Sequence, residues 1–340
     1  MILKKFTGAA AALLLGLSTQ VMAAEEWGFQ PLPLKVPEPA DNPSTAAKVI
    51  LGKQLFFDPR LSKDDTLSCN FCHDVAGNGT DSRSTSIGVD GQLGGRSAPT
   101  VWNAAFLSSQ FWDGRAASLE EQAKGPILNP IEMGITHEAA AVDRIASIPG
   151  YQEQFAAIFG GEKPVTYDNI AKAIAVYERT LITPNSLFDQ YLRGDKTALN
   201  KKALAGMKEF ENLGCIRCHN GPNFAGPQLE KGEIFYQYFP ANRSEYDKLL
   251  GLQEDEGHRN DGGDKTPSLW RVPSLRNIAL TGPYFHNGSV PTLNKAVRVM
   301  AKVQLNRDIT DEQADNLEAF LETLTGEFTV QLPPKLPKDI

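Results

Sequence analysis

Two short segments, residues 69–73 and 215–219, constrain this chain more than any other feature. Each has the spacing C-x-x-C-H, and together they use all 4 cysteines of the 340-residue sequence. Two thiols at this spacing can form thioether bonds to both vinyl groups of one porphyrin, and the histidine that follows can bind its iron. The motifs therefore predict two covalently bound c-type haems, held by Cys69, Cys72, His73, Cys215, Cys218 and His219.

A lone C-x-x-C pair could instead be a redox-active dithiol or half of a zinc site. Here both pairs are followed by histidine and no cysteine is left over, which favours haem. Zinc sites made from two C-x-x-C pairs usually place the pairs roughly 15–20 residues apart. The pairs in this chain are much further apart, so the zinc interpretation is the weaker one.

The N-terminus has the pattern of a secretory signal peptide. Lys4 and Lys5 precede a short apolar run, and Val21-Met22-Ala23 is a suitable cleavage site. We therefore expect residues 1–23 to be a signal peptide and the mature protein to be periplasmic, because bacteria attach c-type haem outside the cytoplasm. An uncleaved anchor is less favoured, since the run is short for a bilayer span, and no later segment is apolar enough to cross a membrane.

The charge and length of the chain limit its partners and its organisation. The formal net charge is −7 at pH 7, whereas nucleic-acid-binding domains are usually basic. Nucleic acid is therefore not an expected partner. The length after removal of a signal peptide suits two domains, which is also the number of haem motifs.

Helical periodicity dominates the chain, and strand patterns are scarce. Ser44 and Thr136 are the expected caps of two helices, of which the second should end at Pro149-Gly150. Further helices are expected over residues 151–159, 167–181, 199–212 and 311–324, and loops over 74–98 and 220–270.

The pattern predicts an all-α fold of two fused cytochrome c-like domains, each with one covalently bound haem and long loops between helices. Pro184 ends the helix of the first half, and the domain boundary is expected there. The predicted domains are residues 24–184 and 185–340.

The second axial ligand of each haem separates electron transfer from chemistry. Met300 lies C-terminal to the second motif and is the expected ligand there, while Met207 suits a helix core and Met133 a pocket wall. The first haem has no evident sixth ligand in its own half, so its iron could bind a small oxidant. The alternative is a haem closed by a second histidine, for which the candidates are His137, His258 and His286.

Several segments resemble the bacterial dihaem cytochrome c peroxidase family. They are LGKQLFFDPR at 51–60, APT at 98–100, QFWDGR at 110–115, EM at 132–133, VPSLRN at 272–277 and PYFH at 283–286. The resemblance covers nearly the whole mature chain. It implies a homodimeric peroxidase that reduces hydrogen peroxide to water with electrons from a small cytochrome c or a cupredoxin.

The resemblance also implies different roles for the two haems. The haem on His73 would be the low-potential, peroxidatic site. The haem on His219 and Met300 would have the high potential and accept electrons from the donor.

Three further residues receive catalytic roles from the resemblance. Trp112 would lie between the haems, although a buried core tryptophan is the ordinary alternative. Glu132 and Gln122 would lie on the open face of the peroxidatic haem. There a buried carboxylate can move a proton between the peroxide oxygens, and an amide can orient the peroxide.

The family also binds one calcium ion between its domains. The backbone carbonyls of Thr281 and Pro283 match two of its ligands. Ser97 stands where the family usually has asparagine, and its hydroxyl is still an oxygen ligand of the kind that calcium accepts.

A second departure concerns the loop after the first haem motif. Many family members have a histidine there that closes the peroxidatic iron in the resting enzyme. Val89 stands at that position in this chain and cannot ligate iron. We therefore predict that the first haem is accessible in the oxidised protein and reacts with peroxide without prior reduction.

The sequence leaves two other functions open. A related dihaem oxidase modifies a partner protein, but the relative that does so replaces the methionine ligand with tyrosine, whereas this chain has Met300. A non-enzymatic dihaem electron carrier would need two six-coordinate irons and would have no use for Glu132.

Overall fold

A computed structural model describes residues 28–258 and 269–338, so the predicted signal peptide lies outside the described residues. In these two ranges the chain consists of helices and loops, apart from one antiparallel pair of short strands, β1 (Tyr236–Tyr238) and β2 (Leu269–Arg271). The predicted all-α class is confirmed. No helix in the described ranges has the length and apolar composition needed to cross a membrane.

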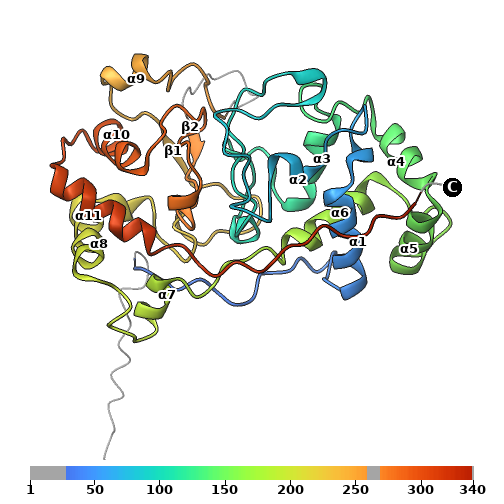
Figure 1. Ribbon diagram of the computed structural model, residues 1–340, viewed down its shortest axis with the longest axis horizontal. Coiled ribbons are helices and arrows are strands. Elements are labelled where there is room, and N and C mark those ends of the chain that lie inside the picture. The colour runs from blue at the N-terminus through green and yellow to red at the C-terminus, as the bar shows by residue number, and fades with distance from the viewer. Residues whose placement is uncertain (1–27, 259–268, 339–340) are drawn as a thin grey trace, which may run out of the picture.

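Two groups of helices form the two halves of the molecule (Figure 1). In the first half α1 and α3 pack on α6, and in the second half α8 and α10 pack on α11. The helices are α1 (Ala46–Phe57), α2 (Cys69–Cys72), α3 (Leu119–Leu128), α4 (Glu138–Ala146), α5 (Pro149–Phe159), α6 (Tyr167–Glu178), α7 (Leu187–Leu192), α8 (Lys201–Leu213), α9 (Glu245–Leu249), α10 (Leu293–Leu305) and α11 (Asp311–Glu322). Short 3-10 turns are η1 (Pro59–Leu61), η2 (Val89–Gly91), η3 (Ala104–Phe106), η4 (Cys215–Arg217) and η5 (Ile278–Leu280).

Each half encloses its own hydrophobic core. The first core takes its buried residues from 51–181, and the second takes them from 188–324. Burial of these apolar faces is the main term that stabilises each half. The domain limits given above stay a prediction.

Three strongly patterned helices begin within two residues of the predicted starts, but α6 ends at Glu178 and α11 ends at Glu322, before the predicted ends at 181 and 324. Thr166 caps α6 by accepting a hydrogen bond from Asn169 N, and Gly214 ends α8 with a left-handed φ of 94°. Thr310 and Gln313 form the predicted capping box at the start of α11.

Two predicted caps are wrong by one residue. Thr45, not Ser44, accepts the hydrogen bond from the first turn of α1. His137, not Thr136, caps α4 through its Nδ1 atom. Pro149 separates two helices as predicted, but it does so as the first residue of α5, where its fixed φ suits a helix start.

A backbone motif of about twenty residues occurs once in each half, in segments 98–116 and 272–290. Asn103 and Asn277 both have left-handed φ angles, of 64° and 60°, and Phe111 and Phe285 have φ of 66° and 69°. Bridges between Gln110 and Ala116 and between Tyr284 and Val290 close the two turns. The two segments are therefore an internal repeat, in which Trp112 and His286 occupy equivalent positions.

The two repeats form reciprocal backbone hydrogen bonds with each other. Ser97 N donates to His286 O (2.7 Å), and Arg271 N donates to Trp112 O (3.1 Å). The side-chain amides of both repeat asparagines donate to the same Thr183 Oγ1, at 2.7 and 2.9 Å. An approximate two-fold axis thus passes near Thr183 and relates the two halves.

The ends of the described chain cross over to the opposite halves (Figure 1). Phe29 packs against Phe188 and Phe224 in the second core. The C-terminal tail, drawn in red, runs back along the first half, where Arg60 Nη2 donates to Pro337 O (2.9 Å). Both ends therefore tie the halves together.

Candidate haem and peroxide site

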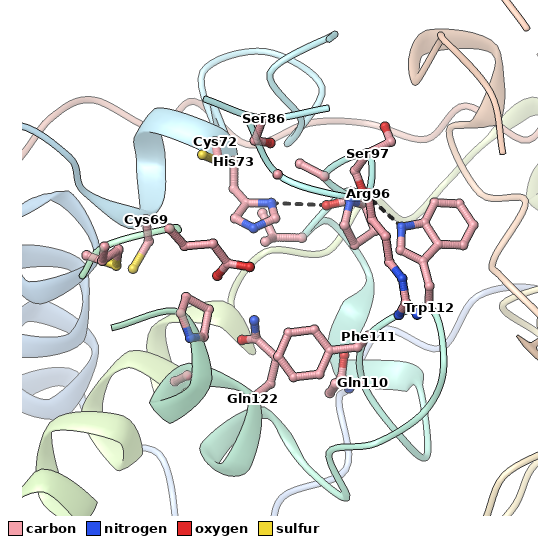
Figure 2. A pocket seen from close by; sticks show the side chains of 18 of the residues that line it. Cys69, Cys72, His73, Ser86, Arg96, Ser97, Gln110, Phe111, Trp112 and Gln122 are labelled. Carbon is pink, nitrogen blue, oxygen red and sulfur yellow. Dashed lines mark hydrogen bonds between the residues drawn. The ribbon is translucent and has the colours of Figure 1, made fainter. Parts of the chain in front are cut away.

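A cavity of about 380 Å³ lies beside the first C-x-x-C-H motif, and Cys69, Cys72 and His73 all line it (Figure 2). His73 Nδ1 lies 3.0 Å from Pro99 O. A carbonyl oxygen can only accept a hydrogen bond, so Nδ1 carries the proton and Nε2 keeps the lone pair that a metal needs. Ser68 precedes α2, and this short helix places the thiols of Cys69 and Cys72 on the cavity wall.

Gln122 and Glu132 line the same cavity as His73. Gln122 lies on α3, and Figure 2 shows its amide pointing across the cavity toward the His73 ring. Glu132 lies in the turn that follows α3. Its carboxyl is largely shielded from solvent, and this burial raises its pKa, while the Arg115 charge and a hydrogen bond with Asn129 partly oppose the rise. A carboxyl with a raised pKa can accept and return a proton near neutral pH.

Of the five histidines, all of which the structure describes, His73 alone lines this cavity. His137 caps α4, and His258 Nδ1 lies 3.0 Å from Asp113 O. His286 lines a cavity in the second half. The three histidines considered as closing ligands therefore all lie outside the first cavity.

The loop that contains Val89 is docked beside Glu132. Val89 is 1% exposed and does not line the cavity, whereas its neighbours Ile87 and Gly88 do. Val89 N donates to Glu132 O (2.9 Å). A side chain on Gly88 would collide with the Ile131 carbonyl, so the loop approaches this turn as closely as only glycine permits.

The second motif lines two overlapping cavities of about 180 and 90 Å³. Cys215, His219 and Met300 border both, and Cys218 borders the smaller one. His219 Nδ1 lies 3.0 Å from Phe224 O, which repeats the arrangement of His73. Met300, on α10, can thus offer its thioether to the same site as His219.

The other two methionines within the described ranges have different surroundings. Met207 packs against the second core. Met133 is buried in the first core and also lines the wall of the first cavity.

Trp112 borders all three cavities, at the centre of the first repeat. Its indole Nε1 donates to Ser97 O (2.8 Å), as the dashed line in Figure 2 shows. The next residue, Asp113, pairs with Arg96 (2.7 Å), and Arg96 also pairs with Asp255 (2.6 Å). This network fixes the turn and joins the two halves beside Trp112.

The geometry fits two haems. Each cavity system combines one C-x-x-C pair with one histidine whose Nδ1 is already bonded. Within the described ranges, no three His, Cys, Asp or Glu side chains are grouped as a metal site would require. Buried polar groups are normally hydrogen-bonded. Four buried atoms without a partner nevertheless belong to residues that border these cavities, as expected where a polar ligand has a place: Glu178 Oε2, Trp102 Nε1, Trp270 Nε1 and His286 Nε2.

The three residues expected to bind calcium border one cavity. Ser97, Thr281 and Pro283 all line the larger cavity of the second motif. The carbonyls of Thr281 and Pro283 accept no hydrogen bond within the described part of the chain. Ser97 O accepts from Trp112, and Ser97 Oγ lies 3.4 Å from Arg83 O. Calcium binding stays a prediction.

Fold and site together are those of a cytochrome c-like protein with two candidate haem sites. A family model described as di-haem cytochrome c peroxidase matches residues 46–197, and one described as RoxA-like, cytochrome c-like matches residues 270–303. The chain is 45% identical to the cytochrome c551 peroxidase of Nitrosomonas europaea, over 99% of this chain and 96% of the relative. It is 42% identical to the cytochrome c551 peroxidase of Pseudomonas aeruginosa, over 91% and 87%.

Among solved structures, a MauG-like protein associated with microbial copper homeostasis is similar, with a TM-score of 0.72 and 28% identity over 89% of this chain and 96% of that one. The chain belongs to the di-haem cytochrome c peroxidase family. It is therefore an oxidoreductase of the cytochrome c peroxidase class, and its family implies two c-type haems.

Two buried charged residues at the cavities were not found from the sequence, Arg271 and Glu178. Arg271 borders both cavities of the second motif, and burial lowers its pKa to about 10. Its guanidinium donates to the carbonyls of Phe111 and Val272. Aligning the sequences of the two repeats would have singled out Arg271, because it is charged and the equivalent residue in the first repeat, Ser97, is neutral.

Proposed function

We propose that the protein is a periplasmic peroxidase that reduces hydrogen peroxide to water with electrons from a small cytochrome c or a cupredoxin. One observation supports this most directly. The first cavity combines His73 with Glu132 and Gln122 and has no second histidine, whereas the second cavity combines His219 with Met300. The relatives' names, cytochrome c551 peroxidase, support peroxide as the substrate and a small cytochrome as the donor.

Bound haem would supply an iron that binds peroxide and exchanges electrons. In the first cavity His73 would hold that iron, and the amide of Gln122 orients the peroxide. Glu132 would accept a proton from one peroxide oxygen and return it to the other, which leaves as water. Overall, two electrons and two protons convert one hydrogen peroxide to two waters.

The second cavity is suited to a haem of higher potential. A thioether ligand such as Met300 raises the potential of a c-type haem. The buried charge of Arg271 acts in the same direction, because it disfavours the additional positive charge of oxidised iron. Electrons would enter at this haem and pass beside Trp112 to the first cavity.

The position of Val89 supports an accessible iron in the oxidised protein. The expected electron paramagnetic resonance spectrum of the oxidised protein has one high-spin and one low-spin ferric haem. The protein should also react with peroxide before any reduction. Two low-spin signals would contradict the proposal, and lack of peroxide turnover with a reduced cytochrome would favour the electron carrier.

The second candidate function is oxidation of a partner protein. The similarity to a solved MauG-like protein is the observation that favours it. Met300 argues against it, for the reason given above. We further propose a cleaved signal peptide, one calcium ion between the halves at Ser97, Thr281 and Pro283, and a homodimer. A metal analysis of the purified protein and its mass in solution test the last two.

A further inference from the structure

The internal repeat makes two residues equivalent that line different cavities. The backbone N–H groups of the repeat asparagines donate to Leu181 O (2.8 Å) and to Leu324 O (3.2 Å), so the chain after α6 corresponds to the chain after α11. Three residues before these leucines stand Glu178 and Leu321, which are 4% and 5% exposed. Glu178 lines the first haem cavity, and Leu321 lines the second.

Helix geometry supports this equivalence. Residues four positions apart lie on the same face of a helix, and Ile174 and Glu178 line the first cavity as Leu317 and Leu321 line the second. Leu321 shows that an apolar side chain is sufficient at this position to complete a haem cavity. The carboxyl of Glu178 therefore serves something that only the first cavity needs.

The carboxyl of Glu178 forms no ion pair within the described ranges. Its Oε2 atom is buried and has no hydrogen-bond partner. The adjacent Arg179 pairs through Nη2 with Glu120 Oε1 at 2.5 Å, whereas its buried Nη1 has no hydrogen-bond partner. Burial raises the pKa of Glu178 to about 8, with Arg179 lowering it and Glu120 raising it.

Other ionisable groups near this face are occupied elsewhere. On α1, Lys48 donates to Asn42 Oδ1 and Pro43 O, both at 3.0 Å. The Tyr177 hydroxyl lies 3.0 Å from a side-chain oxygen of the C-terminal tail. On α2, Cys69 would be a thioether once haem is attached and would not titrate.

We propose that Glu178 is the proton-accepting residue of the first haem cavity: its carboxylate takes up one proton from solvent when the haem there gains one electron, and releases it on oxidation. The inference rests on the proposed first haem, but it does not depend on peroxide turnover. The two proposals can therefore fail separately.

The direction of the coupling follows from charge. Reduction removes one positive charge from the haem, so the nearby carboxylate is stabilised less and its pKa rises. Between the pKa values of the oxidised and reduced states, each electron brings a proton, and the midpoint potential falls as the pH rises. The second haem has Leu321 in the equivalent place and should show no such dependence over the same range.

The test is a spectroelectrochemical titration of each haem in the full-length holoprotein between about pH 6 and 10. In the wild type, the potential of the first haem should fall with pH toward a limit of one proton per electron, and the second should stay constant. Glu178→Gln should abolish the dependence and give a higher potential than the wild type at alkaline pH. Glu121→Gln, an exposed glutamate on α3, is the matched control and should behave as the wild type.

Either a wild-type potential that does not vary with pH or an unchanged slope in Glu178→Gln overturns the proposal. If that variant loses haem, redox-difference infrared spectroscopy of Glu132→Gln decides the question. Reduction should then still produce the carbonyl band of a newly protonated carboxyl, and its absence would refute the assignment. If the slope is present but peroxide turnover is not, the proposed function fails and Glu178 keeps its role.

Discussion

Replacing Glu132 with glutamine should remove a proton carrier while leaving its loop in place. Both backbone hydrogen bonds at this residue survive the change, from Glu132 N to Asn129 O (3.1 Å) and from Val89 N to Glu132 O (2.9 Å). Glutamine also has nearly the same shape as glutamate. We therefore expect normal folding and haem content.

The loss of activity should be large, because the two aspartates that line the same cavity cannot replace Glu132. Asp113 and Asp255 line the same cavity, but both pair with Arg96. Although burial opposes it, hydrogen bonding to Arg96 keeps the pKa of both carboxyls low, so they are weak bases near neutral pH. General acid–base groups contribute about 10²–10⁴-fold in rate, which corresponds to about 2.7–5.5 kcal/mol of activation free energy. We expect a loss within this range.

The assay is steady-state peroxide reduction with a reduced small cytochrome, together with a stopped-flow measurement of the first reaction with peroxide. Haem content is measured on the same samples, and Glu121→Gln is the matched control. A Glu132→Gln protein with full haem content and turnover within a few-fold of the wild type would refute the proposed role.

Three further changes test the remaining assignments. Met300→His should lower the potential of the second haem by a large margin and slow electron entry, and a Met300→Ala protein with the wild-type spectrum and potential would rule out this ligand. Val89→His should displace the loop, because imidazole is too large for the space beside Gly134. The new histidine should create a low-spin resting haem that needs one electron before it reacts with peroxide. An unchanged high-spin signal would contradict this prediction. Arg115→Gln removes a charge that lowers the pKa of Glu132, so the acidic limb of the kcat/KM profile should move to higher pH, and an unmoved limb would show that Arg115 does not act on this carboxyl.

The parts of the fold with a local signal could be predicted from the sequence. The haem motifs are defined by spacing alone, and α6 by a threonine cap followed by a regular apolar face. α3 was not predicted, because Gly125 and Pro126 interrupt its pattern; in the structure the ring of Pro126 lies in the last turn, and tertiary packing on α6 overrides the weak propensity. Helices α2, α7, α9 and α10 were also not predicted, and α9 lies in the segment 220–270 that was expected to be loop.

The composition of the cavities could be predicted only in part. Family motifs indicated Glu132, Gln122 and Trp112, and the structure brings all three to the cavity of His73. The charges of Arg271 and Glu178 become informative only once their burial is known, because an exposed arginine or glutamate would have an ordinary pKa. Burial here depends on contacts between residues far apart in the sequence, such as that of Arg271 with the turn at Phe111.

The reciprocal bonds between the two repeats have the form of an isologous contact, such as two identical subunits make across a two-fold axis. A chain of half this length that paired with a second copy of itself through these turns would already hold two like cavities side by side. Fusion of two such copies into one polypeptide removes the requirement that they stay identical. Leucine and glutamate at one equivalent position, and arginine and serine at another, are the kind of divergence that such a fusion would permit.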